Sequence, residues 1–96
     1  MGYNVFMLIT WDENKAESNL KKHGISFDEA QSVFFVSSSI TIEYKEHGEE
    51  RFVTIAFSKK LNLLVVVYAY READEIRIIS ARKATKKEKK IYEERI

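Results

Sequence analysis

The chain lacks cysteine and proline altogether, and its 96 residues include only three glycines and two histidines. Without cysteine there is no disulfide framework, no thiolate metal site and no cysteine nucleophile. His23 and His47 fall on different expected elements and no carboxylate stands at ligand spacing from either, so we expect no metal site and no cofactor. Neither a Gly-rich phosphate loop nor a Gly-x-Ser-x-Gly elbow occurs.

Long hydrophobic runs are also missing. The longest, residues 63–70, is too short to cross a bilayer, so we expect no membrane association. The N-terminus lacks the basic start and the small-residue cleavage site of a signal peptide. These absences predict a cytoplasmic protein. No repeat or low-complexity linker divides the chain, and we expect a single domain over residues 1–96.

Positive charge is the scarcer sign in the first half of the chain and negative charge in the second, although the net charge is only +1. Residues 1–50 carry four Lys or Arg and nine Asp or Glu, whereas residues 51–96 carry twelve and six. Six of the cations fall between positions 82 and 90. Segregated charge can steer a polyanion or an acidic partner towards one surface, although a run of lysines is ordinarily a solvated helix face.

Hydrophobic periodicity predicts an α+β fold. Residues 5–11 are β-branched and aromatic enough for a first strand. Asp12 and Ser26 are N-cap residues for two short helices, which Gly24 separates, and the second helix should bury Val33 and Phe34.

From Ser39 the hydrophobic period changes to two. A capping box, Thr85-Lys-Lys-Glu88, then opens a C-terminal helix. We therefore expect a small antiparallel β-sheet, a meander, with two N-terminal helices and a C-terminal helix packed on it. The four strands of the meander are predicted at residues 40–45, 51–58, 63–70 and 76–82.

Four arginines lie in or at the ends of the predicted strands: Arg51, Arg71, Arg77 and Arg82. Arg binds phosphate through two N–H groups and keeps its charge at physiological pH, although a single strand-end arginine more often contacts solvent or a surface carboxylate. With a two-residue turn after Glu72, Arg71 and Arg82 would share a face about 20 Å apart, and Arg77 would point to the other face. Regular strands do not bring these arginines together, so a bulge, a strong twist or a role elsewhere, such as partner binding, must account for some of them.

Two further groups of residues have both a structural and a functional interpretation. Lys22 and His23 end the first helix, where a cation complements the helix dipole, but His is also the commonest proton-transfer residue. Tyr92 follows the lysine-rich run; an aromatic ring beside cations can stack on a base, or it can pack on the sheet.

Four segments together resemble the BrnT family of toxins: "WDENKAESNLKKHGISFDEAQSVF", "GEERFVTI", "LLVVVYAYRE" and "IRIISARKATKKEKKIYEE". The resemblance implies a small ribonuclease with a RelE-like fold, the toxin of a type II toxin–antitoxin pair that cleaves RNA and inhibits translation and growth. It also implies a BrnA-type antitoxin with a ribbon-helix-helix DNA-binding part, and a heterotetramer as one expected assembly. Two stretches depart from the family pattern, "FFVSSS" after the second helix and "YAY" before Arg71.

The family pattern, carried over by position, implies the residues of the site. The implied catalytic residues are Lys22, His23, Glu50, Arg51, Arg71 and Arg82. The implied RNA-binding residues are Arg77, Lys83, Lys86 and Tyr92. Attack of a ribose 2′-OH on its own phosphate needs a base, an acid and cations for the phosphorane charge, and arginines can supply the cations without a metal. A non-catalytic RNA- or protein-binding domain of the same fold, and a structural partner of an acidic chain, are the alternatives.

Overall fold

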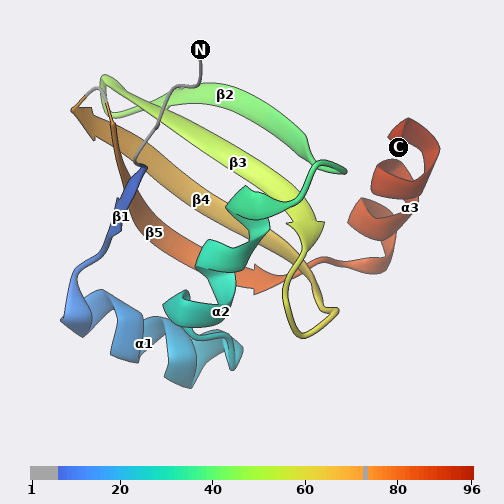
Figure 1. The fold of residues 1–96 in the computed structure, drawn as a ribbon, viewed down its shortest axis with the longest axis horizontal. Helices are drawn as coiled ribbons and strands as arrows, with labels where there is room; N and C mark the ends of the chain where they lie inside the picture. Colours follow the sequence, from blue (N-terminus) through green and yellow to red (C-terminus); the bar gives the residue numbers. More distant parts are fainter. Residues whose placement is uncertain (1–6, 73) are drawn as a thin grey trace, which may run out of the picture.

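Strands and helices follow one another along the chain as Figure 1 shows, in a computed structural model that describes residues 7–72 and 74–96. Two α-helices and a 3-10 helix separate the first strand from four consecutive strands, and a third α-helix ends the chain. The elements are β1 (Leu8–Thr10), α1 (Glu13–His23), α2 (Phe27–Gln31), η1 (Ser32–Phe35), β2 (Ile40–Glu46), β3 (Glu49–Phe57), β4 (Leu63–Glu72), β5 (Glu75–Lys83) and α3 (Lys86–Arg95).

The five strands form one mixed sheet in the order β1-β5-β4-β3-β2. Strands β2 to β5 are antiparallel neighbours, as the period-two pattern predicts. The α+β class is therefore confirmed, but the expectation of a purely antiparallel sheet is wrong, because β1 pairs with β5 in parallel. β1 pairs with residues more than sixty positions further along the chain, which no local pattern reveals. Of the predicted strand at residues 5–11, residues 5 and 6 lie outside the described part.

Local signals set the limits of the helices. The Asp12 carboxylate accepts a hydrogen bond from the Asn14 backbone N–H at 2.8 Å, and Gly24, with φ of 72°, ends α1 in the left-handed region. Beyond Ser26 the helical layout differs from the prediction. The second helix ends at Gln31, and the buried Val33 and its neighbour Phe34 belong to the 3-10 helix η1 instead. The sequence pattern of a 3-10 turn is too short to be separated from that of an α-helix.

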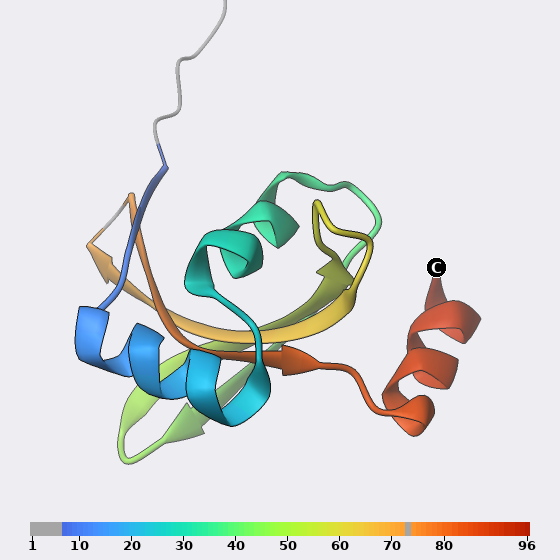
Figure 2. The same cartoon turned by 90° about the horizontal axis from the view of Figure 1, so that it is seen from below.

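Each face of the sheet carries its own hydrophobic cluster. On one face, Ile25, Phe27 and Val33 from the helical segment pack against Leu64, Val66 and Ile78 of the sheet. Figure 2 shows α2 lying over this face of the curved sheet. On the opposite face, Ile55 and Val65 pack against Tyr92 of α3. In Figures 1 and 2, α1 and α3 stand at opposite ends of the molecule. Much of the sheet face that carries Ile55 and Val65 is therefore covered by neither helix.

A buried amide fixes α1 along β5. The Asn19 side chain is 7% exposed; its Nδ2 donates to the backbone carbonyls of Ala81 and Ile25, and its Oδ1 accepts from the Ala81 N–H. All three bonds are to backbone, so they align the helix with the strand irrespective of neighbouring side chains. Because Asn19 is level with Ala81 while Thr10 pairs with Arg77, the first turn of α1 is held near the Arg77 end of β5.

Candidate functional site

Two β-bulges between β4 and β5 decide where the arginines point. Val67 pairs with Ser80, but the next pair is Tyr68 with Ile78, so Ile79 has no partner on β4. A second irregularity between Tyr70 and Glu72 leaves Arg71 without a partner on β5. An extra residue reverses the alternation of all side chains beyond it.

The first bulge brings Arg77 and Arg82 to the same face of the sheet. Arg82 pairs with Val65 and Arg77 pairs with Ala69, and positions 65 and 69 of β4 face the same way. The expectation for a regular strand, with Arg77 on the opposite face, therefore does not hold, and a bulge, one of the alternatives named from the sequence, is the reason. Arg77 and Arg82 are five positions apart, so in a regular strand they would point to opposite faces. The bulged Ile79 adds one unpaired residue between them and so puts them on the same face.

Arg51 joins Arg77 across the middle strand. Val53 pairs with Val67, so Arg51 lies on the same face and the register brings it level with Ala69. Ala69 is 1% exposed and stands between the two arginines, whose Cα atoms are about 10 Å apart at the usual strand spacing. A methyl group at this central position leaves room above it for both guanidinium groups.

These arginines line a small recess of about 60 Å³ at the end of the sheet nearest the start of α1. Its volume holds a few water-sized groups, which is the scale of a phosphate group. The polar lining consists of four cations and two carboxylates, so its formal charge is positive. The lining residues are Asp12, Lys15, Glu49, Arg51, Arg71, Arg77, Ile78 and Ile79, and we refer to the space between them as the cationic recess.

Ion pairs hold Arg51 in place within the cationic recess. Its Nη1 lies 3.1 Å from the Glu46 carboxylate and its Nη2 lies 3.8 Å from that of Glu49. Its Nε is buried and has no hydrogen-bond partner in the part of the chain that the structure describes. Leaving a buried donor of a charged group unsatisfied costs free energy, which an anionic acceptor would recover. Over residues 7–72 and 74–96, Arg71, Arg77 and Lys15 form no ion pair.

Arg82, by contrast, lies on the same face but outside the cationic recess, and it is ion-paired with Glu88. Its Nη1 and Nη2 donate to the two carboxylate oxygens of Glu88 at 2.7 and 2.8 Å, and Glu88 also accepts from the Thr85 N–H to close the capping box. The hydrogen bonds from Arg82 lower the pKa of Glu88 to about 2, and the same contact raises the pKa of Arg82. Arg82 therefore makes the contact with a surface carboxylate that the sequence predicts as the ordinary role of a strand-end arginine.

The remaining residues implied by the resemblance lie outside the cationic recess. Lys22 and His23 form the last turn of α1, about 12 Å along the helix from Lys15 at the usual rise. Glu50 is exposed and points away from the face that carries Arg51, because neighbouring strand residues alternate. The exposed residues Lys83 and Lys86 flank the start of α3.

Tyr92 is the most buried of these implied residues. It is 6% exposed, its ring packs edge-on against Phe57, and its hydroxyl donates to the Ser38 carbonyl at 2.8 Å. Of the two interpretations of this tyrosine, the geometry favours packing on the sheet.

Three residues of the recess were not predicted as site residues from spacing: Asp12, Lys15 and Glu49. A signal for Glu49 was present, because residues two apart in a strand share a face and Glu49 precedes Arg51 by two. Asp12 and Lys15 flank the first turn of α1, and the parallel pairing of β1 with β5 together with the bonds from Asn19 to Ala81 brings that turn beside Arg77. That long-range contact has no local signature.

Within the described residues, no group of three His, Asp or Glu side chains converges as metal ligands would. Nor does that part of the chain contain a helix with the length and apolar character needed to span a membrane.

Comparison with known proteins assigns the chain to a family. Residues 11–88 match the family model described as "Ribonuclease toxin, BrnT, of type II toxin-antitoxin system". The chain belongs to the BrnT family. This match spans every residue of the cationic recess and ends at Glu88, the partner of Arg82.

A solved BrnT structure has the same fold. The crystal structure of the Brucella abortus ribonuclease toxin BrnT superposes with a TM-score of 0.68 at 26% sequence identity, and the match covers 83% of this chain and 99% of that one. The comparison with curated proteins gave no match. Membership of the BrnT family makes this chain a ribonuclease toxin of the type II class, which implies an RNA substrate and an antitoxin partner.

Proposed function

We propose that the cationic recess is the active site of a metal-independent endoribonuclease that inhibits translation and growth by cleaving RNA. The observation that carries this proposal is the convergence of Arg51, Arg71 and Arg77 from three adjacent strands on one recess, with the Arg51 Nε lacking a partner in the described chain. Three guanidinium groups around one recess match the two non-bridging oxygens and the leaving 5′-oxygen of a phosphate under attack.

In the proposed reaction, the ribose 2′-oxygen attacks the adjacent phosphorus while the bond from phosphorus to the 5′-oxygen breaks. Glu49 is the proposed general base for the 2′-OH proton, because its carboxylate lines the recess beside Arg51. The 5′-oxygen takes a proton as it leaves, and the Lys15 ammonium is the proposed donor. The products are a 2′,3′-cyclic phosphate and a 5′-hydroxyl, and no electrons are transferred.

The arginines have a different task from the acid and the base. Arg77 and Arg71 carry no competing carboxylate within residues 7–72 and 74–96, so both are free to bind phosphate oxygens. Positive charge that is already in place when the phosphorane forms stabilises it without reorganisation. A catalytic role for Arg82, Lys22, His23 or Glu50, and RNA binding by Lys83, Lys86 or Tyr92, stay predictions from the resemblance.

The finer features of the family resemblance also stay predictions. These are a RelE-like fold, a BrnA-type antitoxin with a ribbon-helix-helix part, and a heterotetramer of the two chains. Covering the recess is one way in which such an antitoxin silences the toxin, since an acidic segment would compete with RNA phosphates for the same arginines.

Incubation of the purified chain with RNA in the presence of a chelator tests the proposed function. Cleavage that persists in the chelator, and that leaves 2′,3′-cyclic phosphate ends, is the expected result. Retention of RNA in a salt-dependent manner without any cleavage would instead identify a binding domain of the same fold.

A further inference from the structure

The turn between β3 and β4 exposes a leucine in an unfavourable conformation. Leu61 is 80% exposed, and its φ of 62° lies in the left-handed region that favours Gly, Asn and Asp. Of the non-glycine residues in the described chain, only His47 shares this feature, with φ of 53°. A hydrophobic side chain in solvent and a strained backbone at the same position both act against folding, so neither explains why leucine stands there.

The shape of this turn is imposed by a buried carboxylate from α2. Glu29 is 3% exposed, and one of its oxygens accepts from Ser58 Oγ at 2.6 Å and from Asn62 Nδ2 at 2.8 Å, which ties both ends of the turn to the helix. Burial raises the pKa of Glu29, but these hydrogen bonds and the nearby lysines outweigh burial, so the pKa lies below its ordinary value. The carboxylate therefore stays ionised while it clamps the turn.

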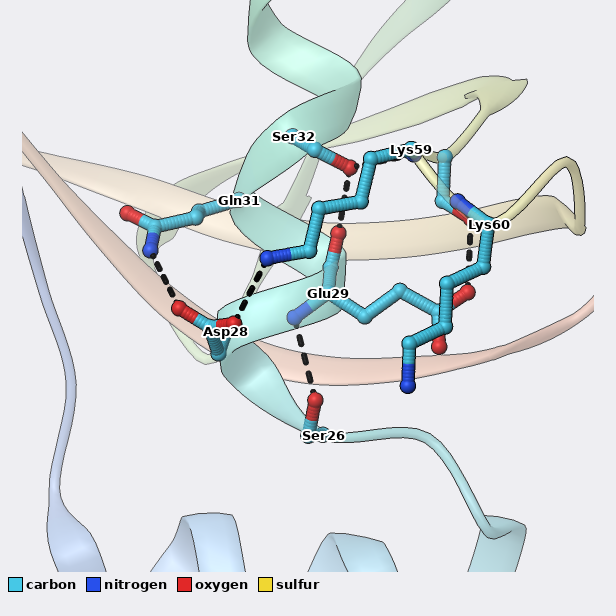
Figure 3. Close-up of polar contacts among 8 residues, drawn as sticks. Ser26, Asp28, Glu29, Gln31, Ser32, Lys59 and Lys60 are labelled. Carbon is cyan, nitrogen blue, oxygen red and sulfur yellow. Dashed lines mark hydrogen bonds and ion pairs between the residues drawn. The ribbon is translucent and has the colours of Figure 1, made fainter.

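Two further contacts brace the same turn from outside. Figure 3 shows Lys59 reaching across α2 to Asp28, with Nζ to Oδ2 at 2.7 Å. The Lys59 backbone N–H also donates to Ser32 Oγ at 2.9 Å. The turn is thus a rigid projection, so Leu61 at its tip is held in place before any partner arrives, and little conformational entropy is lost on binding.

Positive charge lies beside the turn that carries Leu61. Lys60 and Lys83 are both exposed and both lie close enough to Glu29 to lower its pKa. Neither lysine has an ion-pair partner in the described residues. An apolar tip among free cations is complementary to a surface that offers an apolar socket with an acidic rim.

We propose that Leu61 is a docking point for an acidic segment of the antitoxin, one that places an apolar socket over the leucine and carboxylates beside Lys60 and Lys83. The proposal rests on the proposed function, because it takes the partner from the toxin–antitoxin class. RNA is the less suitable occupant, since an aliphatic side chain neither stacks on a base nor forms a hydrogen bond. Arg51 lies near the start of β3 and Leu61 lies in the turn beyond its last residue, Phe57. Arg51 and Phe57 are about 20 Å apart at the usual strand rise, so this docking point is separate from the cationic recess.

The substitution Leu61→Asn separates folding from binding at this position. Asn tolerates the left-handed region better than Leu, so the variant should unfold at the same temperature as the parent chain or higher. His47→Asn is the matched control, because it relieves the same backbone conformation at another exposed turn. Leu61→Met retains an apolar side chain and should retain binding.

The measurement is the Kd of purified antitoxin for each variant, together with the rate of RNA cleavage by the free chain. We expect Leu61→Asn to bind about tenfold more weakly than the parent, His47→Asn and Leu61→Met to bind normally, and all three to cleave RNA at the parent rate. Equal affinities of Leu61→Asn and His47→Asn overturn the proposal, and so does a loss of cleavage in Leu61→Asn with normal antitoxin binding. Cleavage by the parent chain decides the proposed function separately.

Discussion

Arg82 and Glu88 form a two-point ion pair, with both terminal nitrogens of the guanidinium bonded to the two carboxylate oxygens. Glu88 is also the N3 residue of the capping box of α3, so this contact joins the end of β5 to the start of the last helix. Tyr92, one turn further along α3, packs into the cluster on the same face of the sheet. The pair therefore fixes the position from which α3 covers that cluster.

Removing the guanidinium should loosen α3. We expect Arg82→Ala to lower the free energy of unfolding by about 1–2 kcal/mol. This is the range for hydrogen bonds to a charged group, reduced because the pair is partly exposed to solvent. Arg82→Lys should restore little, because a single ammonium cannot form both bonds. Urea denaturation measures the change, with Lys89→Ala on the same helix as the control. Equal stability of the Arg82→Ala variant and the control would show that the pair contributes nothing.

The same ion pair predicts a dependence of stability on pH. The pKa of Glu88 falls from its ordinary value of 4.5 to about 2 in the folded chain. A carboxyl with a lowered folded-state pKa stabilises the fold above its unfolded pKa, and this contribution disappears as the pH falls towards the folded value. The stability difference between the parent chain and Glu88→Gln should therefore be largest above about pH 4.5 and shrink towards pH 2. A difference that stays constant over this range contradicts the assignment.

Glu49 and Glu50 provide a matched pair of variants, because they are adjacent in β3 and point to opposite faces. Glu49→Gln should slow RNA cleavage by about a hundredfold or more if the carboxylate takes the 2′-OH proton. Glu50→Gln changes the charge of the chain equally but lies away from the recess, so it should cleave at the parent rate. Single-turnover cleavage rates at several pH values compare the two. The opposite order of effects would return the catalytic role to Glu50, as the resemblance implies.

His23 distinguishes two assignments of the proton transfer. Its place in the last turn of α1, away from the cationic recess, favours a role in completing the helix, where a cation complements the dipole. His23→Gln should then retain cleavage within a few-fold of the parent chain and lose only a little stability. A large loss of rate, with the acidic limb of the pH profile removed, would place His23 in the reaction.

The local structure of this chain was predictable because its signals are short-range. The caps at Asp12, Ser26 and Thr85, the left-handed Gly24 and the period-two strands all depend on residues within a few positions of one another. The parallel pairing of β1 with β5 was not predictable, because it joins residues more than sixty positions apart. The prediction of a single helix over α2 and η1 has a different cause, because the pattern of a 3-10 turn is too short to be separated from that of an α-helix.

The cationic residues of the site were predictable from the sequence, but their position on the sheet and their grouping were not. The bulged Ile79 and Arg71 are ordinary strand residues in sequence, yet the bulges turn Arg77 onto the face of Arg51 and so assemble the recess. The pairing of Arg82 with Glu88 was equally hidden, since the capping box that reveals Glu88 says nothing of a second partner. Small shifts in register, which leave no trace in composition, decided which arginines meet.

The most direct test of the cationic recess is the single-turnover rate of RNA cleavage by Arg77→Ala in the presence of a chelator. Arg77 is half-buried in the recess, whereas Arg95 at the end of α3 is exposed and outside it, so Arg95→Ala is the matched control. We expect Arg77→Ala to fold normally and to cleave RNA about 10²–10³ times more slowly than the parent chain, because one group that stabilises the transition state is lost. Arg95→Ala should cleave RNA at the parent rate. Cleavage by Arg77→Ala at the rate of Arg95→Ala would contradict the assignment of the active site to this recess.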